Sequence, residues 1–214
     1  MIKAVIFDFD GIIVDSERLH WAAFNMVMQP LGKAVSWPEY VQTYIGFDDR
    51  GAFRHAIPDL SSEALRELIE GKASVFQELL ESDGAAALPG SVALIKHLSG
   101  KIPIAICSGA LRADILPILG KLGIEKAFDT IVTADDTHIS KPDPAPYKLA
   151  AKKLGVTSGL AIEDTPAGIA SAKGAGLKVL AVTNSYPPEL LTQADAVVAS
   201  LEGLTLEKLN QLVG

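Results

Sequence analysis

Two aspartates, Asp8 and Asp10, follow a short apolar run near the start of the chain. Side chains two residues apart point to the same side of an extended backbone, so the two carboxylates share a face. Like charges held this close are costly unless a cation or a shared proton relieves them. An aspartate at a strand end also often caps the next helix, so neither residue decides the chemistry alone.

Polar groups follow three other apolar runs. Ser108 precedes a glycine, Lys141 precedes a proline that restricts its backbone to extended conformations, and Glu163 and Asp164 form a second acidic pair. Taken singly, Ser108 and its glycine read as a turn, Lys141 as a surface lysine, and the acidic pair as the start of a helix. Taken together, we expect four carboxylates, one lysine and one hydroxyl at the same edge of one sheet.

Phosphoryl transfer assisted by Mg²⁺ is the chemistry that needs such a set. Mg²⁺ prefers oxygen ligands and would neutralise the crowded carboxylates. One aspartate could attack phosphorus while the ion and Lys141 hold the equatorial oxygens, and the other could move a proton to the leaving oxygen. We therefore expect Mg²⁺ as the cofactor.

The elements that must position these groups follow from the hydrophobic pattern. Short, near-continuous apolar runs alternate with helical stretches, which predicts an α/β fold with a doubly wound, Rossmann-like parallel sheet. Ligands bind beyond the carboxyl ends of the strands in such sheets. Strands are expected at Ala4–Phe9, Ile102–Cys107, Thr130–Thr133, Leu160–Ile162, Val179–Val182 and Ala196–Val198, and helices at Ser91–Leu98, Ala113–Leu122, Ala145–Leu154 and Ala167–Ala175.

One segment interrupts the alternation. From about Asp15 to Leu88 we find no convincing strand, but several amphipathic helical stretches, of which Glu63–Leu80 is the clearest. An insertion of this size is too large for a loop. We therefore expect a core domain of residues 1–14 and 89–214 and a helical cap domain of residues 15–88, which would close over the site about hinges at its two ends.

Composition limits the partners. Lys and Arg number 19 against 26 Asp and Glu, a formal net charge of −7, which argues against nucleic acid but leaves small anionic substrates open. The single cysteine, Cys107, excludes an intramolecular disulfide and fits a reducing compartment. Neither a signal peptide nor a membrane span is evident. We expect a cytoplasmic protein, a monomer or weak homodimer.

The motifs resemble those of the haloacid dehalogenase-like superfamily in order and spacing, from residue 2 to about residue 185. The inserted helices resemble the cap of its β-phosphoglucomutase and phosphoglycolate phosphatase branch. Dehalogenation is not expected, because the dehalogenases of this superfamily lack an aspartate at the place of Asp10. The matching motifs are Asp8-x-Asp10-Gly11, Ser108-Gly109, Lys141-Pro142 and the run Ile162–Gly168.

The resemblance implies a role for each motif residue. These roles are a nucleophile, a proton carrier, phosphate-binding groups and metal ligands. Asp8 would form an aspartyl-phosphate and bind Mg²⁺; Asp10 would be the general acid and base, with its backbone carbonyl on the metal; Gly11, Ser108 and Gly109 would bind the phosphoryl group; Lys141 would balance charge between Asp8 and the phosphate; and Glu163 and Asp164 would complete the metal site, directly or through water.

Two cap residues are candidates for the substrate side of the site. His20 resembles a hinge position that helps to place Asp10 in β-phosphoglucomutase, or is a histidine on a helix surface. Lys72 stands where the mutase has a lysine over the substrate, or is a surface lysine whose stem lies along apolar neighbours.

Two departures favour a phosphatase over a mutase. Asp49 stands where the mutase has a cap arginine, with Arg50 one residue later, and Arg112 follows the second motif where the mutase has a different polar set. Arg50 and Arg112 remain candidate substrate contacts. We expect a Mg²⁺-dependent phosphomonoester hydrolase for a small phosphorylated metabolite such as a sugar phosphate. The alternatives are a β-phosphoglucomutase-type sugar phosphomutase and a non-enzymatic binding module, the latter of which should lack at least one chemical residue.

Overall fold

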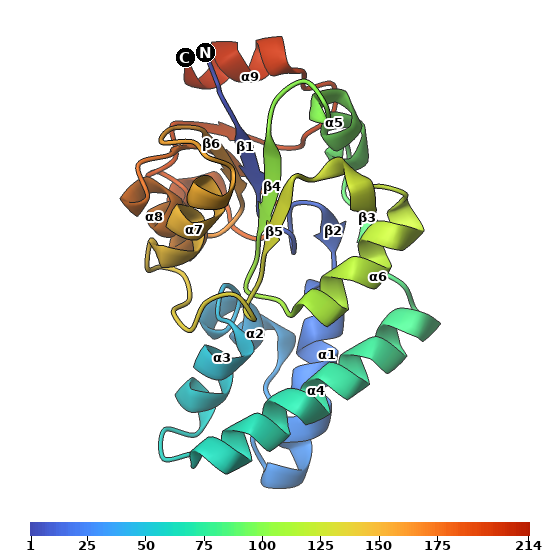
Figure 1. Ribbon diagram of the computed structural model, residues 1–214. Helices are drawn as coiled ribbons and strands as arrows, with labels where there is room; N and C mark the ends of the chain where they lie inside the picture. Colours follow the sequence, from blue (N-terminus) through green and yellow to red (C-terminus); the bar gives the residue numbers. More distant parts are fainter.

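A six-stranded parallel sheet forms the centre of the computed structural model, which describes residues 1–214 (Figure 1). The strand order is β5-β4-β1-β6-β7-β8, so the first strand lies in the middle of the sheet. This confirms the predicted doubly wound α/β fold, and no strand end differs from its predicted position by more than two residues. The strands are β1 (Val5–Phe7), β4 (Ile104–Cys107), β5 (Thr130–Val132), β6 (Leu160–Glu163), β7 (Lys178–Val182) and β8 (Ala196–Val198).

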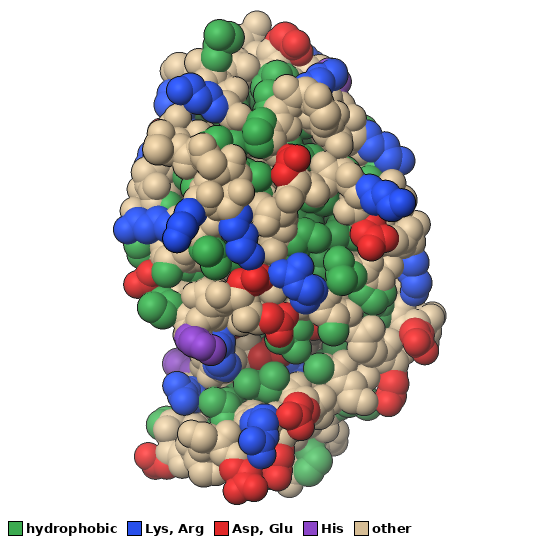
Figure 2. All heavy atoms as spheres, in the orientation of Figure 1, with side chains coloured by type: hydrophobic (Ala, Val, Ile, Leu, Met, Phe, Trp, Pro, Cys, Tyr) green, Lys and Arg blue, Asp and Glu red, His purple; other side chains and the backbone are tan.

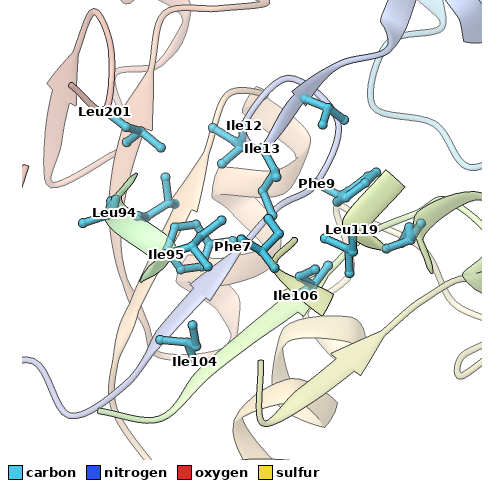
Figure 3. Packing of buried hydrophobic residues seen from close by; sticks show 14 of the residues in the cluster. Phe7, Phe9, Ile12, Ile13, Leu94, Ile95, Ile104, Ile106, Leu119 and Leu201 are labelled. Atoms are coloured by element: carbon cyan, nitrogen blue, oxygen red, sulfur yellow. The ribbon is translucent and has the colours of Figure 1, made fainter. Parts of the chain in front are cut away.

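Helices cover both faces of the sheet because alternate residues of β1 point to opposite sides. Val5 and Phe7 pack with α5, α6 and α9, whereas Ile6 packs with α7 and α8. Figure 3 shows the first of these layers, where Phe7 lies among apolar side chains of α5, α6 and β4. The helices are α5 (Ser91–Leu98), α6 (Arg112–Leu122), α7 (Ala145–Lys153), α8 (Pro166–Gly174) and α9 (Leu206–Val213), with short 3-10 turns at Glu125–Ala127 and Pro188–Leu190.

Four further helices lie beyond the carboxyl end of the sheet, in the lower part of Figure 1. We call residues 17–82 the helical insertion; its own core is built largely from aromatic side chains, including Phe24, Tyr40 and Phe53. None of the helices is both long and apolar enough to span a membrane. The helices are α1 (Glu17–Met28), α2 (Trp37–Thr43), α3 (Asp49–Ala56) and α4 (Ser62–Ser82), with a 3-10 turn at Gln29–Leu31.

A two-stranded antiparallel ribbon joins the helical insertion to the sheet. β2 (Val14–Asp15) pairs with β3 (Ala86–Ala87), and the Ser91 hydroxyl donates a hydrogen bond to the Ile13 carbonyl beside it. The prediction that this part of the chain contains no strand is therefore wrong at its two ends. Strands of two residues carry too little hydrophobic pattern to be seen in a sequence.

Candidate active site

The acidic and hydroxyl side chains meet at the carboxyl edge of the sheet. Asp8 directly follows β1, Ser108 directly follows β4, and Glu163 and Asp164 lie at the end of β6. Backbone hydrogen bonds from Asp8 to Ile162 and from Ser108 to Val132 carry the pairing into the site. All four side chains are buried at this edge.

Lys141 links two of these carboxylates. Its Nζ donates to Oδ1 of Asp8 at 2.9 Å and to Oε1 of Glu163 at 2.6 Å, and the Tyr147 hydroxyl donates to the same Glu163 oxygen at 2.8 Å. Burial opposes the charge on Lys141, but Asp8 and Glu163 outweigh it and raise the lysine pKa. Burial and the charge of Glu163 raise the pKa of Asp8 to about 8, although Lys141 opposes the shift.

The acidic cluster fits a hard divalent cation. Carboxylate oxygens of Asp8, Glu163 and Asp164 lie within 4.8 Å of one another. Oδ1 of Asp164 is buried without any hydrogen-bond partner, and burial together with Glu163 and Asp8 raises the Asp164 pKa well above its usual range. An orphaned buried carboxylate oxygen is costly in a folded protein, and an oxygen-preferring cation would satisfy it.

Glu163 is more completely bonded than its acidic neighbours. Its Oε2 accepts from the backbone nitrogens of Asp164 and Thr165 and from the Thr165 hydroxyl, while Oε1 serves Lys141 and Tyr147. With both of its oxygens engaged, Glu163 is placed to hold Lys141.

Asp10 lies beside the acidic cluster and is held by three side chains. The Ser16 hydroxyl donates to Oδ1 of Asp10, His20 Nε2 lies 3.2 Å from the same oxygen, and the Ser108 hydroxyl donates to Oδ2 at 3.5 Å. Burial opposes the negative charge, but His20 and Ser16 together lower the Asp10 pKa. Burial and Lys72 oppose protonation of His20, yet Asp10 raises the His20 pKa.

A cavity opens between this edge and the helical insertion, and Figure 2 shows the molecule hollowed between its two parts. The sheet side contributes Asp8, Asp10, Ser108, Gly109 and Lys141. On the insertion side the charged lining groups are Glu17, His20, Asp48, Asp49, Arg50 and Lys72.

Comparison with known proteins decides the family. The family model for haloacid dehalogenase-like hydrolases matches residues 5–182. The chain belongs to this family. Hexitol phosphatase A of Escherichia coli is 33% identical over 96% of this chain and 94% of its own. The fructose-1-phosphate phosphatase of Escherichia coli is 30% identical over 83% of this chain and 95% of its own. A crystal structure of β-phosphoglucomutase from Clostridium difficile superposes with a TM-score of 0.88 at 27% identity, covering 100% of this chain and 97% of that one.

Two residues of the helical insertion of this hydrolase, His20 and Lys72, are more buried than the surface alternatives allow. His20 is 8% exposed and stacks on Phe76 with ring centroids 4.2 Å apart. Lys72 is 5% exposed, donates to Asp49 and has its Nζ 3.2 Å from His20 Nδ1. The alternatives of a surface histidine and a surface lysine are therefore wrong.

The two arginines considered for substrate contact differ in position. Arg50 lines the cavity, but its guanidinium is bonded to Asp48 and to the backbone carbonyls of Ala134 and Thr137. Arg112 is not among the lining residues; its guanidinium donates to Asp136 at 2.7 Å and to a backbone carbonyl of β5. The structure thus does not place Arg112 among the residues that line the cavity.

Gly11 lies close to the acidic cluster. Its φ is 76°, and a β-carbon there would stand 1.9 Å from Oδ2 of Asp164. Gly168 is similarly tight, since a β-carbon there would stand 1.9 Å from Oε1 of Glu163. These two glycines make room for the carboxylates of the acidic cluster.

Several functional neighbours were missed by sequence reasoning. Ser185 donates to Oδ2 of Asp164, and it follows the carboxyl end of β7, so the strand-end argument could have found it. Ser16 precedes α1 where a helix cap is common, but its hydroxyl goes to Asp10 instead. Tyr147 lies on α7 and Glu17 on α1, and neither carried a distinguishing signal. Burial raises the pKa of Glu17 to about 7, against the opposing charge of His20.

Proposed function

We propose that this hydrolase is a Mg²⁺-dependent phosphatase that cleaves a small phosphorylated metabolite through an aspartyl-phosphate on Asp8. The observation that carries the proposal is the Lys141 bridge between Asp8 and Glu163, next to an Asp164 oxygen with no partner. A buried nucleophile, its cationic neighbour and an unsatisfied metal ligand then occupy one strand edge. Relatives named as phosphatases of phosphorylated sugars and sugar alcohols support it.

In the first step an Asp8 oxygen attacks phosphorus and the bond from phosphorus to the leaving oxygen breaks. The acid form of Asp10 donates a proton to that leaving oxygen, so the product departs as a neutral alcohol and Asp10 becomes the carboxylate that its surroundings favour. Lys141 and the Ser108 hydroxyl hold phosphoryl oxygens as charge develops on them. Bound at Asp8, the Asp10 carbonyl and Asp164, Mg²⁺ would supply electrostatic stabilisation of the phosphoryl group.

In the second step water releases the phosphate. Asp10 accepts a proton from the water while the water oxygen bonds to phosphorus. The bond from phosphorus to Asp8 breaks. Inorganic phosphate leaves and Asp8 is a carboxylate again. His20 and Ser16 keep the Asp10 carboxyl in one orientation through both transfers.

Asp8→Asn tests the nucleophile. The amide keeps an oxygen that can accept from Lys141 but is a poor nucleophile, so we expect turnover and covalent phosphate labelling to be abolished. Phosphate release from sugar monophosphates and acid-stable labelling of the chain are the measurements. Activity retained within about tenfold would remove Asp8 as the nucleophile.

The metal is tested by exchanging ions. We expect activation by Mg²⁺ and inhibition by Ca²⁺, because the looser coordination of Ca²⁺ misplaces the nucleophile. A binding module would give no turnover for either ion to change.

A sugar phosphomutase is the alternative function, favoured by the likeness to β-phosphoglucomutase over the whole chain. Phosphorus NMR with Mg²⁺, β-glucose 1-phosphate and a trace of the 1,6-bisphosphate separates the two functions. Glucose 6-phosphate without free phosphate would identify a mutase. Accumulation of inorganic phosphate would identify a phosphatase.

A further inference from the structure

Every cationic side chain that the helical insertion turns toward the cavity already has an acidic partner. Lys72 donates to Asp49, and its side chain is 7% exposed. Arg50 is bonded to Asp48 at 3.0 Å. His20 lies 3.2 Å from Asp10.

Two further acidic side chains line the cavity, one from the helical insertion and one from the core. Glu17 lines the cavity from α1, and Asp114 lines it from α6, where Gln77 donates to its Oδ1 at 2.7 Å. Asp49 is the more open member of its ion pair, with 22% of its side chain exposed. A ligand group that reaches this end of the cavity therefore meets carboxylates rather than unpaired cations.

We propose that Asp49 determines leaving-group specificity by excluding substrates that carry a second phosphate. The inference rests on the proposed phosphatase function and names its substrate class: monophosphates whose leaving group is uncharged and rich in hydroxyls. A second phosphate would have to displace Asp49 from Lys72 or lie against its negative charge. Like charges brought together in a partly desolvated site are strongly unfavourable, which is a common basis of specificity.

Hydroxyl groups suit the same surface. A hydroxyl donates to a carboxylate and accepts from an ammonium, so it can join the Asp49 and Lys72 pair without breaking it. The Lys72 ammonium has three N–H donors. Asp49 and His20 account for two of its contacts, which leaves one donor for a ligand. The ion pair therefore offers both a donor and an acceptor to a polyol.

The test compares fructose 1-phosphate with fructose 1,6-bisphosphate. We expect the wild-type enzyme to prefer the monophosphate in kcat/KM, and Asp49→Asn to reduce that preference by about tenfold or more through a gain on the bisphosphate. Asparagine keeps an oxygen that can accept a hydrogen bond from Lys72. Asp49→Ser is the second variant if Asp49→Asn lowers the melting temperature. Asp59→Asn, an exposed change of the same charge outside the cavity, is the control and should leave the preference unchanged.

Binding separates this inference from the proposed function. Calorimetry with both esters on the Asp8→Asn protein, with and without Asp49→Asn, measures the same discrimination without turnover. An affinity ratio that Asp49→Asn leaves within about twofold, or equal binding of both esters to the protein with Asp49 intact, would overturn the role of Asp49. If no form releases phosphate while the affinity ratio still shifts, the phosphatase proposal fails and the role of Asp49 stands.

Discussion

Arg112 has a structural role near this site, which its hydrogen-bond partners show. Asp136 accepts from Arg112, Lys153 and the backbone nitrogen of Thr133, so the arginine belongs to a loop-fastening cluster after β5. Burial opposes ionisation of Asp136, but the hydrogen bonds from Lys153 and Thr133 lower its pKa to about 2. A carboxylate with a lowered pKa stabilises the folded state wherever it is ionised.

Asp136→Asn should therefore cost stability in a pH-dependent way. The contribution of Asp136 is complete above the unfolded pKa of about 3.9 and is lost as pH falls toward about 2. With solvent screening allowed for, we expect the variant to lose about 1 kcal/mol at neutral pH, or about 2–4 °C in Tm. Thermal melts of both proteins from neutral to acidic pH check this. The two curves should converge in acid, and a constant gap would contradict the assignment.

Much of the site at this scale was predictable, because residue type and strand order together limited the possibilities. Asp8, Ser108 and Asp164 each directly follow a strand that the hydrophobic pattern reveals, whereas Lys141 lies in the loop between β5 and α7. The environment of Lys72 was not predictable. Its burial depends on Asp49 and His20, which lie on other helices whose packing no local pattern encodes.

Secondary-structure elements hold the acidic cluster in place by packing closely against its carboxylates. The start of α8 is the clearest case. The Thr165 hydroxyl accepts from Gly168 at the first turn of α8, so this helix begins directly against the Glu163 carboxylate. Any side chain at Gly168 would occupy the space of that carboxylate. The helix start thereby fixes Glu163, and through it Lys141.

Gly168→Ala should displace Glu163 and release Lys141 from its place. We expect kcat to fall about 100-fold, the usual cost of misplacing a catalytic group by about an ångström. Gly120→Ala is the matched control, since Gly120 lies within α6 with open space around its β-carbon position. The control should keep activity and gain about 1 kcal/mol in unfolding free energy. Equal activity in the two variants would show that Glu163 tolerates displacement.

The sheet strands were predictable because strands buried on both faces read as apolar runs. The helices of the insertion were recognised as a group, yet α1, α2 and α3 were not separated, and α9 was not predicted. Their boundaries depend on caps such as Ser36 and Asp48, which resemble ordinary polar loop residues until the helix is seen.

Across the whole molecule, polar side chains of α3 and α4 are among the groups that fasten the helical insertion to the core. Arg50 of α3 donates to carbonyls of the loop after β5, at Ala134 and Thr137. Gln77 of α4 donates to Asp114 of α6 at 2.7 Å. We expect these contacts to favour a closed arrangement of the helical insertion, in which water is kept from the reacting groups.

Arg50→Met should weaken closure without touching the reacting groups. We expect KM to rise about tenfold, because the variant lacks hydrogen bonds from a charged donor that form only in the closed arrangement. Arg54→Met, an exposed change on the same helix, should behave as wild type. Steady-state kinetics on one sugar monophosphate compares them, and an unchanged KM for Arg50→Met would mean that the contact does not govern closure.

The ribbon of β2 and β3 has an evolutionary consequence. Val14 lies opposite Ala87 and Asp15 opposite Ala86, so the chain leaves the sheet and returns to it at neighbouring points. A module with adjacent ends can be exchanged by recombination without changing the span that the recipient must bridge. Substrate range can thus diversify by swapping the inserted helices between relatives while the inherited catalytic edge of the sheet stays as it is.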